Sequence, residues 1–279
     1  MKVGFIGAGK VGFSLGIYMV SRGLCLEGYY SRNLASAQAA AQLSSSRAFS
    51  SLEEVVAACD CLFITVPDDA LAQVWQKMQN FSLQGKLVCH CSGLSASKVF
   101  VRAKELGASA YSLHPILALP DKNSAAALGS AYFTLEGDEA GLDKMRTLLA
   151  QMGNPYERIE AEKKPLYHAA CVSVSNLMNG LAKMGEDLFA ECGLDAQFSQ
   201  NAWHALFLGQ AQNIAKMGVV DSLTGPVERG DVCTIATHLN KLSNPEREIY
   251  RLLSEKLITI AQEKNPTRDY SLLEKELRQ

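Results

Sequence analysis

The feature that most constrains the fold of this chain is a glycine motif that follows an apolar run at its N-terminus. Residues 2–6 read as a β-strand, and residues 7–12 follow with the pattern Gly-x-Gly-x-x-Gly. Residues 11–22 then have helical spacing and stop at Gly23. A strand, a glycine loop and a helix in this order are the context that a dinucleotide-binding βαβ unit requires.

The rest of the first half repeats this alternation of apolar strands and helices. The expected strands are residues 2–6, 26–30, 61–66, 87–91, 110–113 and 132–135, and the expected helices are residues 11–22, 35–43, 51–58, 69–78, 97–106 and 142–152. Continuous apolar strands separated by helices indicate a parallel sheet that is covered on both faces. The sequence therefore predicts a doubly wound α/β domain.

The second half is expected to be all-helical. One long helix is expected to start at Pro165 and to run to Cys192, where Gly193 can stop it. Further helices are expected at residues 198–217, from Asp231 to about residue 242, and after Pro245. This change of pattern predicts two domains, a dinucleotide-binding domain at residues 1–155 and a helical substrate and dimerisation domain at residues 156–279.

The glycine loop is the expected site for a pyrophosphate. Gly7 allows the tight turn, Gly9 lets the pyrophosphate approach the backbone, and Gly12 lets the helix pack on the strand. The free N–H groups of the helix start favour an anion there. The alternative is a glycine-rich turn without a ligand. The expected cofactor-binding residues of the loop are Gly7, Ala8, Gly9, Lys10, Val11 and Gly12.

The end of the second strand favours NADP over NAD. NAD-binding proteins place an Asp or Glu about 20 residues after the loop, where it accepts bonds from the ribose hydroxyls. This chain has Ser31 and Arg32 there and no carboxylate. A guanidinium suits a 2′-phosphate because it makes charge-assisted, bidentate bonds. The alternative for Arg32 is a surface arginine in a turn.

Later strand ends should line the same crevice. Val66 and Pro67 follow one strand and Ser92 follows another, so we expect them near the adenosine ribose and the nicotinamide. His114 follows a third strand, and we expect it near the substrate. The alternative is a turn histidine that bonds to backbone.

A polar stripe marks the first helix of the second half. At 100° per residue, Lys164, His168, Ser175 and Asn179 lie within about 60° of one another, and Asn176 lies about 80° from His168. Polar groups on an otherwise apolar helix need partners. The stripe therefore indicates a polar substrate site, and its alternative is a solvent-facing edge.

A second polar concentration lies at residues 224–231. Asp231, Thr234 and His238 share one helical face, and Arg229 precedes them in a loop. Arg229 and Asp231 could bind or orient an acidic group of the substrate. The alternative for Asp231 is an N-cap.

The overall charge excludes partners that need a strongly basic surface. Lys and Arg number 27 and Asp and Glu number 29, so nucleic acid and membranes are not expected partners. The N-terminal segment has glycines where a signal peptide needs an apolar core, and no apolar run is long enough to span a membrane, so we expect a cytoplasmic protein.

The cysteines do not indicate a metal site. The two close pairs, Cys59 with Cys61 and Cys89 with Cys91, have CxC spacing rather than the CxxC spacing of zinc sites. Most of the eight cysteines lie in apolar runs, as buried thiols do. No metal is therefore expected.

The chain resembles a bacterial family in which a Rossmann-like domain precedes a helical domain of unknown function. The resemblance covers essentially the whole chain. It rests on the segments GFIGAGKVGFSLG, YYSRN, VPDDAL, HCSG, SLHP, YHAACVSVSN and LTGPVERGD. More distantly, the layout is similar to ketopantoate reductase, pyrroline-5-carboxylate reductase, prephenate dehydrogenase and deazaflavin-dependent NADP oxidoreductases. The resemblance implies an NADP-dependent oxidoreductase that forms a homodimer through the helical domain.

The resemblance leaves the proton donor open. Ketopantoate reductase has a Lys at the start of the long helix and an Asn one or two turns later. Here His168 lies eight residues before Asn176, and Lys164 lies one turn earlier. Hydride transfer to C=O builds charge on oxygen, so an acid or cation is required. We expect His168 or Lys164 to serve as that acid, with Asn176 and Ser92 orienting the substrate.

The sequence thus predicts hydride transfer between NADPH and a small carbonyl or imine compound bound between the domains. A different class of protein would keep the glycine loop and Arg32 but would need no proton donor. That alternative is a non-catalytic NADP-binding sensor or scaffold.

Overall fold

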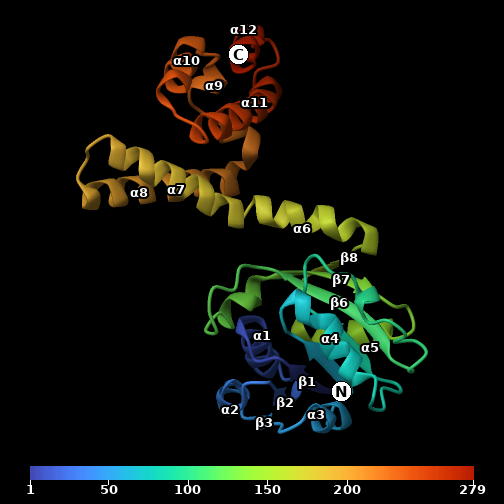
Figure 1. Ribbon diagram of the computed structural model, residues 1–279. Helices are drawn as coiled ribbons and strands as arrows, with labels where there is room; N and C mark the ends of the chain where they lie inside the picture. The colour runs from blue at the N-terminus through green and yellow to red at the C-terminus, as the bar shows by residue number, and fades with distance from the viewer. The chain divides into compact units, whose positions relative to one another are not determined.

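The computed structural model describes residues 1–279, and its contacts divide the chain into two compact units, Met1–Ser175 and Asn176–Gln279. The first unit contains the sheet, with its strands in the order β3-β2-β1-β4-β5-β6-β7-β8 (Figure 1). The strands are β1 Lys2–Ile6, β2 Cys25–Tyr30, β3 Arg47–Ala48, β4 Cys61–Ile64, β5 Leu87–His90, β6 Ser109–Ile116, β7 Tyr132–Gly137 and β8 Tyr156–Arg158. The helices of this unit are α1 Lys10–Ser21, α2 Leu34–Leu43, α3 Leu52–Ala58, α4 Asp68–Met78, α5 Leu142–Met152 and α6 Lys164–Ser173.

The sheet confirms the doubly wound α/β fold, with one antiparallel addition. Strands β3 to β6 pair in parallel, β7 runs antiparallel to β6, and β8 runs parallel to β7. The order reverses between β1 and β4, and ligands bind beside such a switch point at the carboxyl ends of the strands.

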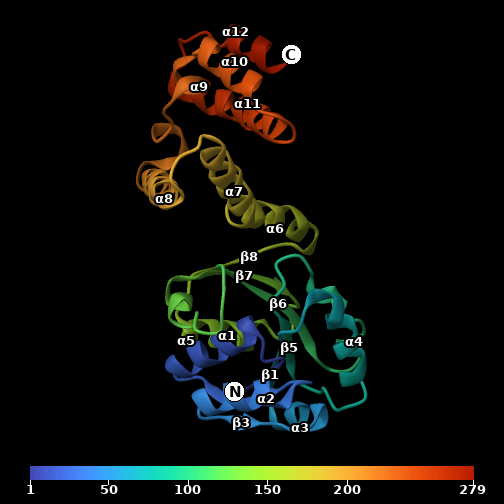
Figure 2. The same cartoon turned by 60° about the vertical axis from the view of Figure 1, so that its left-hand side comes forward.

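Two apolar cores cover the two faces of the sheet. Neighbouring strand residues point to opposite faces, so Phe63 joins one core and Ile64 the other. Helices α1, α2 and α5 supply the first core, and α3 and α4 supply the second. Figure 2 shows α1 and α5 on one side of the sheet and α4 on the other.

One expected helix is wrong. Residues 97–106 form a single 3-10 turn, η1 (Ser97–Val99), and then a series of turns. Arg102 has a positive φ of 64°, which no α-helix accommodates, and the buried carboxylate of Glu136 holds the backbone N–H of Ser97 at 2.6 Å. The crossover between β5 and β6 is therefore mostly irregular.

The first unit extends past residue 155, where the sequence predicts a boundary. Strand β8 pairs with β7, and Lys164 at the start of α6 is buried in the first unit. These contacts join residues 156–175 to the sheet domain.

The expected single helix from Pro165 to Cys192 is also wrong, because the structure has α6 and then a separate helix α7 (Asn176–Glu191). The hydroxyls of Ser173 and Ser175 bond back to the carbonyls of Ala169 and Cys171 at 2.8 and 2.6 Å. Such bonds compete with the helical ladder and often bend it. Lys164 and Asn179 therefore lie on two different helices rather than on one.

The second unit is all-helical. It contains α7, then α8 Ala196–Asp221, α9 Pro226–Arg229, α10 Val232–Lys241, α11 Glu246–Lys264 and α12 Ser271–Leu277. Its apolar core lies among α9 to α12, with Ile235, Ala261 and Leu277 fully buried. No helix has both the length and the apolar content that crossing a membrane requires.

Candidate functional site

The glycine loop joins β1 to α1 and has no room for side chains at two of its glycines. Gly7 has a φ of 112°, and a Cβ there would meet the carbonyl of Thr65 at 2.5 Å. A Cβ on Gly12 would meet the hydroxyl of Thr65 and the carbonyl of Gly7. The Thr65 hydroxyl donates a hydrogen bond of 2.9 Å to that carbonyl, which fixes the loop against β4.

Gly9 is the open position of the loop. A Cβ on Gly9 would meet nothing within 4 Å. Gly9 also precedes α1, whose first turn has neither a side-chain cap nor an acidic residue. The first N–H groups of α1 are therefore available to an anion.

A cavity of about 200 Å³ opens beside the loop. The sequence-predicted residues that line it are Gly7, Ala8, Gly9, Ser31, Arg32, Val66 and Pro67. Lys10 and Gly12 do not line it, and Val11 and Ser92 line a smaller neighbouring cavity of about 110 Å³. The structure thus brings together most of the expected cofactor-binding residues.

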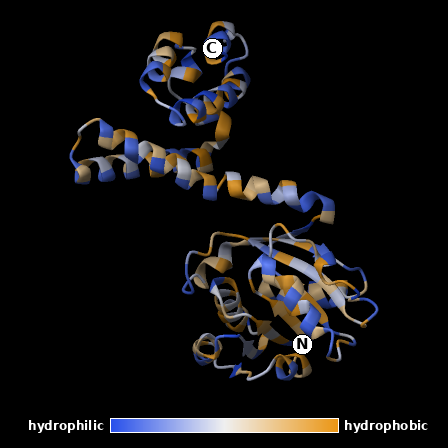
Figure 3. Ribbon diagram, viewed as in Figure 1, coloured by the Kyte–Doolittle hydropathy of each residue, from blue (hydrophilic) through white to orange (hydrophobic).

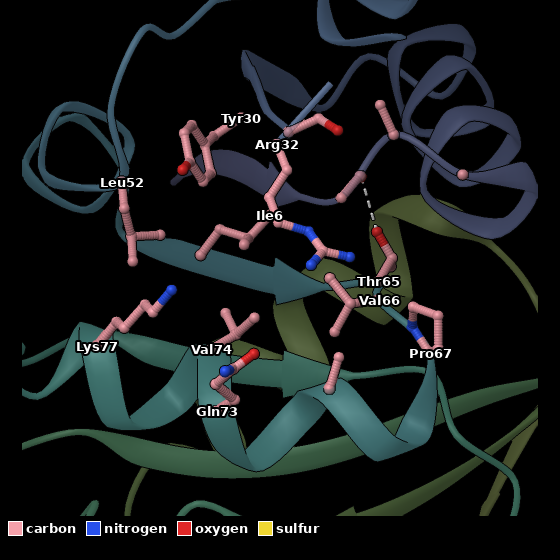
Figure 4. Close-up of a pocket in the computed structure, with 15 residues that line it drawn as sticks. Ile6, Tyr30, Arg32, Leu52, Thr65, Val66, Pro67, Gln73, Val74 and Lys77 are labelled. Atoms are coloured by element: carbon pink, nitrogen blue, oxygen red, sulfur yellow. Dashed lines mark hydrogen bonds between the residues drawn. The ribbon is translucent and has the colours of Figure 1, made fainter. Parts of the chain in front are cut away.

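The cavity has basic side chains and no acidic one. Arg32 reaches into it from the end of β2, and Lys77 points into it from α4 (Figure 4). No Asp or Glu is among its lining residues.

The cavity also has lining residues that the sequence patterns did not single out, among them Tyr30, Leu52, Gln73, Val74 and Lys77. The α4 residues carried a signal, since Lys77 lies one helical turn after Gln73 and Val74.

These features fit a dinucleotide that carries an extra phosphate. The open Gly9 admits the close approach of a pyrophosphate, and the cations suit a 2′-phosphate where a carboxylate would repel it.

A second group of polar residues lies where α6 packs on β6. Lys164 is only 1 % exposed, and its Nζ donates to the carbonyl of Ser92 at 3.1 Å and to the Ser112 hydroxyl at 2.8 Å. Burial lowers the pKa of Lys164, and the charge of Glu136 opposes that shift. No carboxylate lies within 4 Å of the amine, so its hydrogen-bond partners are neutral groups.

His168 follows Lys164 by one turn and is half-buried. Its ring stands edge-on to that of His114, with the ring centres 6.2 Å apart. A Cβ on Gly93 would lie 2.6 Å from Cδ2 of His168 and 2.9 Å from Nε2 of His114. Only a glycine therefore fits between these rings and the end of β5.

The side chain of Ser92 is engaged within its own loop. Its hydroxyl donates to Asp68 at 2.5 Å and accepts from the N–H groups of Leu94 and Ser95 at 3.2 and 2.9 Å. The N–H of Ser92 donates to Nδ1 of the fully buried His90 at 3.2 Å. These bonds hold the loop after β5 in place beside Lys164.

His114 is more than a turn histidine. Its Nδ1 lies 2.6 Å from the hydroxyl of Tyr167, and burial lowers its pKa to about 4, with Lys164 and His168 adding to the shift. Sequence analysis missed Tyr167, Ser112 and Thr134 as members of this group. The two-residue spacing of Ser112 and His114 along β6 was an available signal, because such residues face the same side of a sheet.

Three expected site residues belong to the second unit. Asn176 begins α7, and Arg229 and Asp231 lie at α9 and before α10. Asp231 caps α10, since its carboxylate accepts from the N–H and the hydroxyl of Thr234 at 3.0 and 2.7 Å. Arg229 lies 3.9 Å from that carboxylate. The roles expected for these three residues remain predictions.

The close cysteine pairs lie in and beside buried strands. Burial raises the pKa of Cys59 and of Cys91 to about 12, so these thiols stay protonated at neutral pH. Cys25, Cys192 and Cys233 are exposed, unlike the buried thiols that their surroundings predict.

Two family models match the chain. Residues 1–115 match a Rossmann-like domain, and residues 131–257 match a domain of unknown function (DUF2520). No curated protein matches the chain.

Solved structures share the fold over nearly the whole chain. The protein TM1727 from Thermotoga maritima is 27 % identical with a TM-score of 0.75, over 94 % of this chain and 99 % of that one. BF3122 from Bacteroides fragilis, a proposed NADP oxidoreductase, is 21 % identical with a TM-score of 0.71, over 92 % and 98 %. A reductive aminase from Aspergillus terreus, in complex with NADPH and ethyl-5-oxohexanoate, is 16 % identical with a TM-score of 0.65, over 98 % of each chain. Together the two family models place a Rossmann-like domain before a domain of unknown function (DUF2520) in this chain.

Proposed function

We propose that this protein is an NADP-dependent oxidoreductase that acts on a small carbonyl or imine compound. The observation that carries the proposal is the cavity at the glycine loop, which combines the open Gly9 with Arg32 and Lys77 and has no carboxylate. The carboxyl ends of β1, β4, β5 and β6 share one edge of the sheet, so His114 and Gly93 belong to the same edge as this cavity.

The similar structures support a nicotinamide dinucleotide cofactor. The Aspergillus terreus enzyme is a reductive aminase in complex with NADPH, and a Plasmodium falciparum pyrroline carboxylate reductase with NADP bound also shares the fold at 16 % identity. The names of both relatives describe reductions. For this chain, Gly7 to Gly12, Ser31, Arg32, Val66 and Pro67 would hold the cofactor.

NADPH, when bound, supplies a hydride, so the substrate carbon gains two electrons and one proton. The substrate oxygen or nitrogen then needs a second proton from the protein. We assign this step to His168, because its imidazole is half-buried beside His114 and Gly93. Lys164 is fully enclosed and holds Ser92 and Ser112, so we assign it to positioning the loop after β5.

The test is a panel of aldehydes, ketones and cyclic imines, with NADPH oxidation followed by absorbance. We expect turnover of at least one compound, and we expect His168→Asn to lower kcat by about 10²-fold to 10⁴-fold while NADPH still binds. The matched control is His204→Asn, which changes an exposed histidine of α8. Tight NADPH binding without any turnover would favour the non-catalytic sensor, and absence of NADPH binding would overturn the cofactor assignment.

We also propose that the protein is a homodimer that pairs through α7 and α8. Helix α7 has no buried residue and α8 buries only Ser199, although both carry many apolar side chains (Figure 3). The large exposed ones include Leu177, Leu181, Phe198, Leu206 and Leu208. A second copy presents the same apolar helices, so a two-fold axis would cover both sets at once. Burying each such side chain contributes about 1.5–3 kcal/mol.

A further inference from the structure

A polar chain of three side chains crosses the face of the sheet under α6. Thr134 on β7 lies directly opposite His114 on β6 in the antiparallel register. Tyr167 on α6 touches both, since its hydroxyl lies 3.1 Å from Oγ1 of Thr134 and 2.6 Å from Nδ1 of His114. The Tyr167 and His114 rings meet edge-on, with their centres 5.6 Å apart. Two strands and a helix therefore hold the imidazole in one orientation.

The geometry indicates which atom donates at each step. The Thr134 hydroxyl donates to the phenol oxygen of Tyr167. With Thr134 donating, the phenol hydrogen of Tyr167 has Nδ1 of His114 as an acceptor at 2.6 Å, and Cys171, one turn further along α6, also contacts this phenol.

The other ring nitrogen of His114 is open. Nε2 makes no hydrogen bond within the protein. The buried side-chain atoms without a hydrogen-bond partner are Oη of Tyr29, Nε2 of His90, Oγ of Ser199 and Nε1 of Trp203, so Nε2 of His114 is not one of these buried atoms. Nε2 therefore reaches accessible space, and Gly93 lies beside it without a side chain.

We propose that Thr134 and Tyr167 lock His114 as the neutral tautomer with the proton on Nε2, so that it presents a fixed hydrogen-bond donor to an oxygen or nitrogen acceptor of the bound substrate. Tyr167 is in this sense a positioning residue that acts through His114. The role in substrate binding rests on the proposed function, whereas the tautomer does not.

The surroundings keep this imidazole uncharged. Burial lowers the pKa of His114, the charges of Lys164 and His168 on α6 and of His90 on β5 act in the same direction, and Asp68 on α4 opposes them, which together gives a pKa of about 4. At neutral pH the ring is thus a neutral donor. It would select a substrate with a lone-pair acceptor over one that offers only a cationic N–H group.

The experiment that tests the tautomer is NMR of the intact protein with ¹⁵N-labelled histidine. Long-range ¹H–¹⁵N spectra distinguish the tautomers, and His114→Gln assigns the resonances. We expect Nδ1 of His114 to be unprotonated and Nε2 protonated from pH 8 down to about pH 5. A proton on Nδ1, or an ordinary titration of the ring between pH 6 and 7, would overturn the proposal.

Two variants test whether Tyr167 determines the tautomer of His114. Tyr167→Phe removes only the hydroxyl, and we expect His114 to become a mixture of both tautomers. Thr134→Val is expected to shift the same resonances by a smaller amount, because the phenol remains. Tyr132→Phe makes the matched change on an exposed tyrosine of β7 and should leave the His114 signals unchanged. Unchanged His114 signals in folded Tyr167→Phe would contradict the proposal.

Kinetics separate this inference from the proposed function. With a carbonyl or imine substrate in hand, we expect Tyr167→Phe to lower kcat/KM about tenfold. If no compound is turned over but the spectra show the expected tautomer, the proposed function fails and the locked histidine stands. If turnover occurs and the proton lies on Nδ1, the proposed function stands and this inference fails.

Discussion

The amine of Lys164 lies 2.8 Å from the hydroxyl of Ser112, in the interior of the sheet domain and in no ion pair with a carboxylate. A buried cation held only by neutral groups costs free energy, because water solvates an ammonium better than hydroxyls and carbonyls do. The same burial lowers the pKa of Lys164. This arrangement separates the roles of the two candidate acids on α6.

The first prediction concerns the stability of Lys164 variants. Lys164→Met keeps the volume and removes the buried charge, so we expect its free energy of unfolding at pH 7 to lie within about 1.5 kcal/mol of the parent or above it. Lys164→Ala leaves a cavity and is expected to cost about 2–4 kcal/mol. Urea unfolding followed by circular dichroism measures both. Equal, large losses in the two variants would show that the charge itself stabilises the fold.

The second prediction concerns the cofactor. Arg32→Ala should weaken NADPH binding by about 30-fold to 100-fold, which corresponds to the loss of about 2–3 kcal/mol of charge-assisted bonding. NADH binding should change little, because NADH lacks the 2′-phosphate. Calorimetric titration of both nucleotides gives the ratio, and Arg146→Ala on α5 serves as an exposed control. An unchanged ratio would remove the argument for NADP.

The third prediction compares two glycines of the loop. Gly12→Ala should destabilise the free protein by about 1–3 kcal/mol, because its Cβ would overlap Thr65 and Gly7. Gly9→Ala should leave the stability of the free protein nearly unchanged, since its Cβ meets nothing. It should nevertheless weaken NADPH binding, because the methyl group occupies space that the pyrophosphate needs. If Gly9→Ala binds NADPH normally, the pyrophosphate does not lie at this loop.

The fourth prediction concerns acid stability. Burial lowers the pKa of His90 and of His114 from 6.5 to about 4. The folded state therefore favours the neutral rings, and the unfolded chain binds more protons between pH 6.5 and 4. This stability is fully present above pH 6.5 and is lost as the pH falls toward 4.

When the pH falls from 7.5 to 5, each of these two histidines should lower the free energy of unfolding by about 2 kcal/mol, because its ring is protonated in the unfolded chain only. His114→Gln should remove its share of that loss, while His204→Gln on exposed α8 should not. Denaturant unfolding at the two pH values provides the measurement. The same pH dependence in His114→Gln and in the parent would show that His114 titrates normally.

The fifth prediction concerns the apolar helices of the second unit. Light scattering should give the mass of a dimer for the parent chain. A charge at Leu206, which is 68 % exposed on α8, should produce monomers in Leu206→Glu. Leu43→Glu makes the same change at a similarly exposed leucine of α2 and should leave the dimer intact. A parent chain that is monomeric at micromolar concentration would exclude this interface.

Local chemistry in the sequence determined the dinucleotide half of the molecule. The glycines from Gly7 to Gly12 lie within a single loop, and Arg32 closely follows its strand in the sequence. Both features can therefore be recognised without knowledge of long-range contacts. Six of the eight strands were predictable from their apolar runs, which bury on both faces, whereas the short strands β3 and β8 were not expected. The helix expected at residues 97–106 failed, because Glu136, distant in sequence, holds Ser97.

Only the tertiary structure distinguished the surroundings of the polar residues of α6. Helical spacing placed Lys164 and His168 on one face and could not tell them apart. Burial against Ser92 and Ser112 encloses Lys164, while His168 stays half-buried beside His114. The hydrogen bond between Tyr167 and His114 joins residues 53 positions apart, and it depends on how β6, β7 and α6 pack together. Residue types are local properties of a sequence, whereas desolvation and hydrogen-bond partners arise only when distant segments meet.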